Sequence, residues 1–189
     1  MSKPNFLKNH QNPKLTTMKR TKIFGAAVAM LFCAANANAQ ATATANASAT
    51  IVSPISISKT TDLSFGNISV DATGGTVILE PSLAATRSIG GAGGVTFPSN
   101  TGTVTAAAFT VSGQADFTFA TNVINSSIIL SNGTEDMLVE NFSISAGAGT
   151  LSPAGTQNIY IGADLLVNPS QASGIYTSAA PFTVLVNYN

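Results

Sequence analysis

The sequence has almost none of the residues that most often carry enzyme chemistry. Its single cysteine, Cys33, and its single histidine, His10, both precede residue 40, and it has no tryptophan. Without cysteine there is no disulfide and no thiol nucleophile, and zinc sites draw mainly on cysteine and histidine. General acid–base catalysis at neutral pH most often uses histidine. From residue 40 onward we therefore expect no enzyme activity, no metal site and no cofactor.

Positive charge is also scarce beyond residue 39. Only Lys59 and Arg87 are basic there, against eight aspartates and glutamates, so this part of the chain has a net charge of −6. Nucleic acids and anionic membranes attract basic patches on proteins. We therefore expect neither of them as a partner.

The N-terminal segment has the layout of a secretory signal. Residues 18–22 (MKRTK) are basic, residues 23–35 (IFGAAVAMLFCAA) are apolar, and Ala37-Asn38-Ala39 is a small-x-small cleavage sequence. The apolar run is shorter than the roughly twenty residues that a membrane-spanning helix needs. We predict a signal helix within residues 1–39 that is removed after Ala39. The mature chain would then have no membrane span and would be secreted, to the periplasm or the cell surface.

Beyond residue 39 the apolar residues follow strand periodicity rather than helix periodicity. Apolar and polar residues alternate over short segments separated by Gly, Pro and Asn turns. The predicted strand regions are residues 51–57, 63–70, 76–80, 106–122, 127–145, 158–167 and 181–189. A chain of about 150 residues suits one domain. The pattern predicts a single all-β domain at residues 40–189, an antiparallel immunoglobulin-like sandwich.

Two turn regions carry more specific predictions. Asn132-Gly133 stands between extended apolar segments and is typical of a type I′ turn, so it indicates a β-hairpin. Residues 88–94 (SIGGAGG) are predicted to form a surface loop, because glycine disfavours regular structure.

The charged residues near these turns are interpreted structurally. Glu135, Asp136 and Glu140 could form the carboxylate pair of a glycosidase, but acids beside a turn are ordinarily solvated, and we predict solvated acids here. Arg87 precedes the glycine-rich segment. It could bind a ligand, but the favoured interpretation is that it holds backbone carbonyl groups.

Two further segments alternate strictly. In residues 41–51 (ATATANASATI) the apolar positions are Ala41, Ala43, Ala45, Ala47, Ala49 and Ile51. This pattern fits either a flexible tether or a strand that lies in a shallow groove, and the sequence leaves both open. In residues 181–189 (PFTVLVNYN) the apolar positions are Phe182, Val184, Val186 and Tyr188, which predicts a half-buried strand.

Three stretches of the chain resemble a known bacterial family. They are ATIVSPISISKTTDLSFGNI near the start, AAFTVSGQADFTF in the middle, and GTQNIYIGADLLVNPSQASGIYTSAAPFTVLVNYN at the end. Together they resemble the family called domain of unknown function 4402. The last stretch is also similar to the ends of spore-coat protein U-like and chaperone-usher pilin-like subunits.

The resemblance implies a specific mode of assembly. In the pilin-like relatives an incomplete immunoglobulin-like sandwich is read at its C-terminal strand by a periplasmic chaperone, and the N-terminal strand of a neighbouring subunit later fills the gap. By this resemblance, Phe182, Val184, Val186 and Tyr188 are the chaperone-recognition positions. The alternating segment from Ala41 to Ile51 is the candidate donor strand, and the partners are other copies of the chain and a chaperone.

Two functions are therefore expected. The first is a non-enzymatic, exported structural or interaction protein, a pilin-like subunit of a surface assembly. The alternative is a secreted monomeric binding module, for which glycans are one candidate ligand. Glycan modules usually stack sugars on exposed tryptophan or tyrosine, and only Tyr160, Tyr176 and Tyr188 are present.

Overall fold

The computed structural model describes residues 40–189 of the chain. Residues Thr50–Asn189 form one compact unit. Residues 40–49 belong to a separate unit and carry no strand. The predicted signal helix and its cleavage sequence, at residues 1–39, lie outside the described residues. No helix in the described part of the chain is long and apolar enough to cross a membrane.

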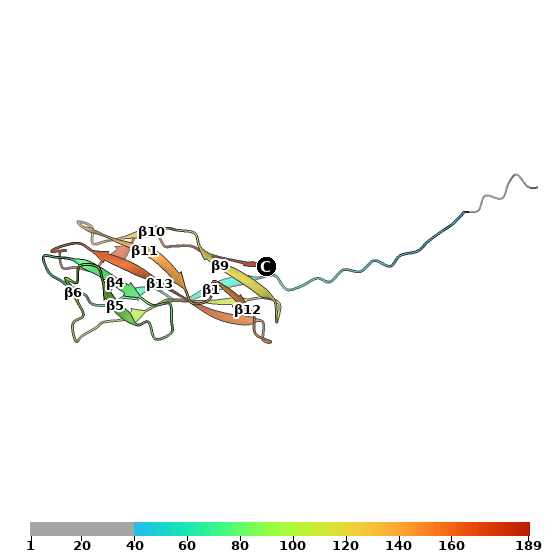
Figure 1. Ribbon diagram of the computed structural model, residues 1–189, viewed down its shortest axis with the longest axis horizontal. Helices are drawn as coiled ribbons and strands as arrows, with labels where there is room; N and C mark the ends of the chain where they lie inside the picture. The colour runs from blue at the N-terminus through green and yellow to red at the C-terminus, as the bar shows by residue number, and fades with distance from the viewer. Residues whose placement is uncertain (1–39) are drawn as a thin grey trace, which may run out of the picture. The chain divides into compact units, whose positions relative to one another are not determined.

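The compact unit is built from antiparallel β-strands (Figure 1). In chain order they are β1 (Ser56–Thr61), β2 (Ser64–Phe65), β3 (Ser69–Val70), β4 (Gly75–Leu79), β5 (Arg87–Gly90), β6 (Val95–Thr96), β7 (Val104–Thr105), β8 (Ala107–Ser112), β9 (Thr118–Val123), β10 (Ser127–Ser131), β11 (Asp136–Ile144), β12 (Ala148–Thr150), β13 (Thr156–Val167), β14 (Thr177–Ser178) and β15 (Val184–Tyr188). The predicted all-β antiparallel fold is confirmed.

The larger layer is an eight-stranded sheet in the order β1-β8-β13-β11-β10-β14, to which β4 and β5 are added beside β13. The longest strand, β13, has twelve residues and runs through its centre. One edge of β13 pairs with β8 through Thr156–Ile161 and with β4 through Ala163–Val167, while the other edge pairs with β11. Every second residue of β13 from Ile159 to Val167 is buried, so this face of the sheet lies against the core.

The second layer of the sandwich is discontinuous. One part is a three-stranded sheet in the order β12-β9-β15, and the rest consists of two two-residue pairs, β2 with β7 and β3 with β6. Two hydrophobic clusters lie between the layers. The first, under β12-β9-β15, contains Phe119, Leu151 and Ile159, none more than 1% exposed. The second, under β2 and β3, contains Phe65, which is 6% exposed.

The predicted hairpin at Asn132-Gly133 is confirmed, but the predicted type I′ turn was wrong. Ser131 pairs with Asp136, so the loop has four residues, and of its members only Gly133 has a positive φ, 93°. A type I′ turn needs positive φ at both central residues. Here the side chain of Asn132 organises the loop instead. Its Oδ1 accepts hydrogen bonds of 2.8 Å from the backbone N–H groups of both Thr134 and Glu135.

Two other local predictions need correction. The prediction that residues 88–94 form one surface loop was wrong, because Arg87–Gly90 form β5 and pair with β4. Pairing with β4 outweighs the low strand propensity of glycine. The first strand begins at Ser56 rather than at residue 51, since Pro54 cannot donate to a ladder.

Candidate functional site

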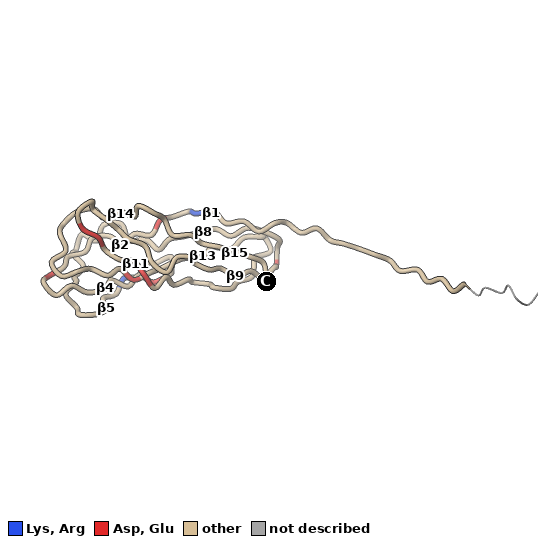
Figure 2. Tube along the Cα trace, turned by 90° about the horizontal axis from the view of Figure 1, so that it is seen from above, with Lys and Arg blue, Asp and Glu red and all other residues tan. Residues whose placement is uncertain are grey.

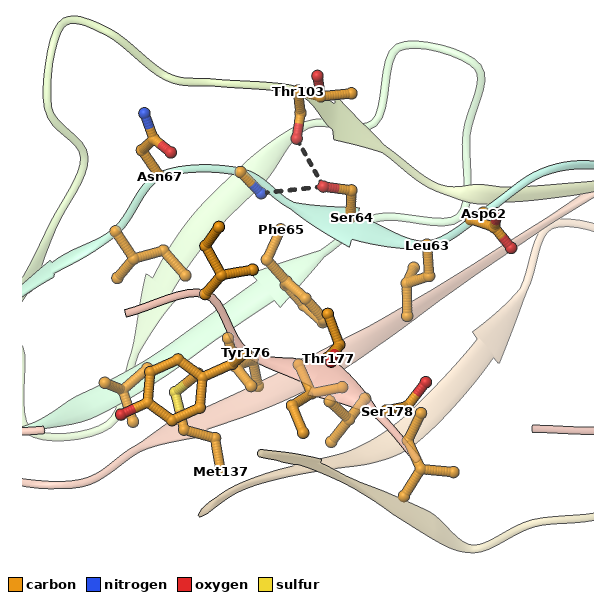
Figure 3. Close-up of a pocket in the computed structure, with 18 of the residues that line it drawn as sticks. Asp62, Leu63, Ser64, Phe65, Asn67, Thr103, Met137, Tyr176, Thr177 and Ser178 are labelled. Atoms are coloured by element: carbon orange, nitrogen blue, oxygen red, sulfur yellow. Dashed lines mark hydrogen bonds between the residues drawn. The ribbon is translucent and has the colours of Figure 1, made fainter. Parts of the chain in front are cut away.

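A groove of about 960 Å³ opens where the second layer is discontinuous. One wall is residues 62–70, which contain β2 and β3. The other is the connection between β13 and β15, residues 168–183, which we name the strap. The floor is the inner face of β10, β11 and β13. Figure 3 shows Phe65 from the first wall and Tyr176 from the strap pointing into the cavity.

The floor of the groove is apolar. Its side chains are Ile128, Leu130, Met137, Val139, Leu165 and Val167. Among the described residues that line the groove, the charged ones are Lys59 and Asp62, and these two pair with each other through Nζ and Oδ1 at 2.5 Å. Figure 2 shows how few charges the domain carries. An occupant would therefore gain free energy by burying apolar groups rather than by pairing charges.

The strands next to the groove have incomplete pairing. Within residues 40–189, β2 pairs only with β7, β3 only with β6 and β14 only with β10. β15 follows the strap without lining the groove, and it pairs only with β9. One edge of each of these strands therefore carries no partner strand. Unpaired edges are templates for the addition of another strand.

Arg87 fixes the first wall of the groove. Its Nη1 donates hydrogen bonds to the backbone oxygens of Phe65, at 2.5 Å, and of Asn67, at 3.0 Å. The guanidinium carbon lies 4.2 Å from the centre of the Phe97 ring. Burial lowers the pKa of Arg87, because desolvation disfavours the charged form. The interpretation that Arg87 holds backbone carbonyls is confirmed.

Replacing this arginine should loosen the wall. In Arg87→Ala the two carbonyl groups lose their charged donor and Phe97 loses its cation, so we expect the free energy of unfolding to fall by about 2 kcal/mol in urea denaturation. Lys59→Ala is the matched control, because it removes the other basic residue from an exposed pair that is worth about 0–1 kcal/mol. Equal effects of the two changes would contradict the role of Arg87.

One carboxylate holds the strap. Oε2 of Glu135 accepts hydrogen bonds from Nε2 of Gln171, at 2.9 Å, and from the backbone N–H of Ala172, at 2.8 Å. The hydroxyl of Tyr176 donates to the backbone oxygen of Ala172 at 2.8 Å. Glu135 is thus partly buried and bound to the strap, so the prediction of a solvated acid was wrong for this residue. Asp136 is exposed, as predicted.

The four predicted recognition positions of the C-terminal segment point into the domain. Val186 is 8% exposed, and Val184 and Tyr188 pack against the same cluster. Phe182 precedes β15, and its ring centre lies 6.4 Å from that of Phe109 and 4.9 Å from that of Phe142. These side chains serve the core, so a partner at this strand would contact its backbone edge.

The segment from Ala41 to Ile51 forms no strand in the described structure. Ile51 lies in the compact unit and is 98% exposed. An aliphatic side chain gains no burial energy at such a position. Within its own domain, Ile51 therefore has no packing role.

The three tyrosines do not form an exposed aromatic surface. All three are partly buried. Tyr188 and Tyr176 use their hydroxyl groups for internal hydrogen bonds. Sugar stacking requires an aromatic face that is open to solvent, and neither of these two side chains has one.

Sequence reasoning missed the groove and the strap. Glu135 contacts residues 36 and 37 positions away, and no local pattern marks such a pair. The one available signal was the long stretch from Pro169 to Pro181, which has little alternation and many small residues.

The fold and the groove define a β-sandwich domain with an incomplete second layer and an open apolar groove. A family model described as domain of unknown function (DUF4402) matches residues 55–188, and the chain belongs to this family. The match extends from just before β1 to the end of β15 and so includes both groove walls. No curated protein and no solved structure matches the chain.

Proposed function

We propose that the protein is an exported, non-enzymatic subunit of a surface assembly, and that its groove accepts an extended strand from another chain. The observation that carries this proposal is the gap in the second layer, with its apolar floor and unpaired strand edges. An extended strand presents every second side chain to one face. It could therefore bury apolar side chains on the floor while its backbone pairs with the edges of the gap.

The N-terminal segment of a second copy is the proposed occupant. Residues 41–51 alternate as an inserted strand requires, and at about 3.3 Å per residue they would extend over about 36 Å. Their alanines would gain little from burial, because each buried CH₂ is worth about 0.8 kcal/mol. Most of the affinity would come from backbone pairing, with Ile51 as the largest apolar contribution.

A periplasmic chaperone is the second proposed partner. It would hold the subunit before assembly by pairing with the backbone edge of β15 that β9 leaves open. Leu185, which is 45% exposed, is the aliphatic side chain of β15 that points away from the core. Such a chaperone places the assembly step in the periplasm, which agrees with the predicted signal sequence.

The proposal is tested by the mass of residues 40–189 in solution, measured by light scattering. We expect oligomers that grow with concentration, and monomers when residues 40–50 are removed. Ile51→Asp should also weaken association, by about tenfold or more, because a charge would have to enter the apolar groove.

Leu83→Asp is the matched control. Leu83 is also highly exposed, at 82%, but it does not line the groove. We expect this variant to associate as the unchanged protein does. A stable monomer for residues 40–189 at all concentrations would contradict strand exchange between copies.

A further inference from the structure

The strap is the most weakly held part of the groove. Of its sixteen residues only Gln171, Tyr176 and Phe182 are partly buried, and the others are exposed. Its regular structure is the two-residue strand β14, in which Ser178 pairs with Leu130 and Thr177 with Ser131. Segments with few buried apolar contacts open at lower free energy than the rest of a domain.

Each end of the strap has a separate fixed point. At the first end Glu135 holds Gln171 and Ala172, as described above. At the other end the backbone N–H of Thr183 donates to Oδ1 of Asn125 at 2.7 Å, and the Phe182 ring packs among two other phenylalanines. The part between these points is attached to the sheet by β14 and by the Tyr176 ring.

Tyr176 occupies space in the groove itself. Its ring packs against the second hydrophobic cluster, and Figure 3 shows it beside Met137. Within the strap the hydroxyl donates to the backbone oxygen of Ala172 at 2.8 Å and accepts from Nε2 of Gln171 at 3.0 Å. Outside the strap it lies 3.5 Å from Oε2 of Glu135. If the strap moves, this group of three residues can move together and keep two of its hydrogen bonds.

Small residues flank β14 on both sides. Ala172, Ser173 and Gly174 precede Ile175 and Tyr176, while Ala179 and Ala180 follow Ser178. Hinges are short loop segments that absorb changes in φ and ψ, and small residues are common in them. The strap therefore has a candidate hinge at Ala179 and Ala180, while residues 172–174 lie within the group that moves together with Tyr176.

We propose that the strap is a gate over the groove. In the closed state, described by the structure, Glu135 and β14 hold the strap against the sheet and the Tyr176 ring fills part of the groove. Opening breaks the three hydrogen bonds from the strap to Glu135, the bond from Gln171 to the backbone oxygen of Asp136 and the β14 pairing. It also withdraws the ring so that a full-length strand can enter. This inference rests on the proposed function, because it assigns the regulation of the same groove.

A disulfide that locks the strap tests the gate. Ser131 and Thr177 are paired residues, and paired residues in antiparallel strands have Cα atoms about 4.5–5.5 Å apart, within the range that a disulfide spans. The probe is a labelled peptide of residues 41–52, followed by fluorescence anisotropy. It is added to residues 51–189, the compact unit without the segment that would fill the groove of another copy. In oxidised Ser131→Cys/Thr177→Cys we expect peptide uptake at least tenfold slower than in the unchanged protein, and recovery after reduction.

The control lock is Ser112→Cys/Thr156→Cys, which joins paired residues of β8 and β13 that do not line the groove. It should leave uptake unchanged in both redox states. If the oxidised strap lock takes up the peptide at the unchanged rate, the gate does not exist.

Hydrogen exchange of the unmodified protein tests the gate without any peptide. The backbone N–H of Ala172 should exchange at least tenfold faster than N–H groups in β11 and β13, and Glu135→Gln should increase its rate further. Exchange of Ala172 only through global unfolding would overturn the proposal. If the unchanged protein binds no peptide, the proposed function fails, while the exchange result still decides whether the strap opens.

Discussion

Gly162→Ala is expected to lower the free energy of unfolding by about 3 kcal/mol or more. Gly162 lies in the centre of β13, where the chain leaving β4 passes directly over it. A Cβ atom there would overlap the backbone oxygen of Leu79 and would lie 2.8 Å from both Glu80 C and Pro81 N. All three are backbone atoms, so no side chain can rotate away, and the sheet itself would have to shift.

Thermal denaturation provides the measurement. A loss of about 3 kcal/mol in a domain of this size lowers the midpoint by about 10 °C. Gly147→Ala is the matched control, because Gly147 has no atom within 4 Å of the added Cβ and no positive φ. Its midpoint should stay within about 2 °C of the unchanged protein. Similar midpoints for both variants would show that the chain leaving β4 does not pass over Gly162 as described.

Tyr188→Ala is expected to cost about 3 kcal/mol. The Tyr188 hydroxyl accepts a hydrogen bond from the backbone N–H of Gln114 at 2.6 Å and donates one to the backbone oxygen of Ser53 at 2.8 Å. The ring lies edge-on to Phe117, with 5.6 Å between ring centres. The alanine variant removes the ring and leaves two backbone groups without their partner, and both losses add to the cost.

Two further variants separate the contributions of Tyr188. Tyr188→Phe keeps the ring, so we expect it to cost only about 1 kcal/mol in urea denaturation. Leu185→Ser, on the outward face of the same strand, should have an effect within about 0.5 kcal/mol. If Tyr188→Ala is as stable as Tyr188→Phe, the ring does not close this end of the sandwich. The yield of exported Tyr188→Ala would in addition show whether this strand takes part in export.

The strands with strong local signals were predicted well from the sequence. The alternation of Phe109 and Val111 and the Asn132-Gly133 pair each marked a strand or hairpin that the structure contains. These signals are local, because the alternation of apolar and polar side chains and the residue preferences of turns depend on neighbouring residues. Arg87 was also interpreted correctly, since a lone arginine beside a glycine-rich segment most readily finds backbone carbonyl oxygens.

The groove could not be predicted in the same way. It is defined by the separation of two segments, residues 62–70 and the strap, that lie about a hundred positions apart in the sequence. The space between two distant segments leaves no periodicity in the sequence. The role of Glu135 was missed for the same reason, since its partners come from the far end of the sequence. The prediction of a loop for the glycine-rich segment was wrong, because pairing of β5 with β4 outweighs the preference of glycine for irregular structure.

The placement of the two basic residues determines how readily trypsin-like proteases cleave the folded domain. Trypsin-like enzymes cleave after lysine or arginine and need a stretch of unpaired, extended chain. In residues 40–189 the basic residues are Lys59 and Arg87. Lys59 lies in β1 and pairs with Phe109 of β8, and Arg87 lies in β5 and pairs with Leu79 of β4. Residues 40–55 contain neither residue type. Cleavage by such an enzyme therefore requires local or global unfolding, so the native domain should persist where trypsin-like activity is high, even with an exposed N-terminal segment.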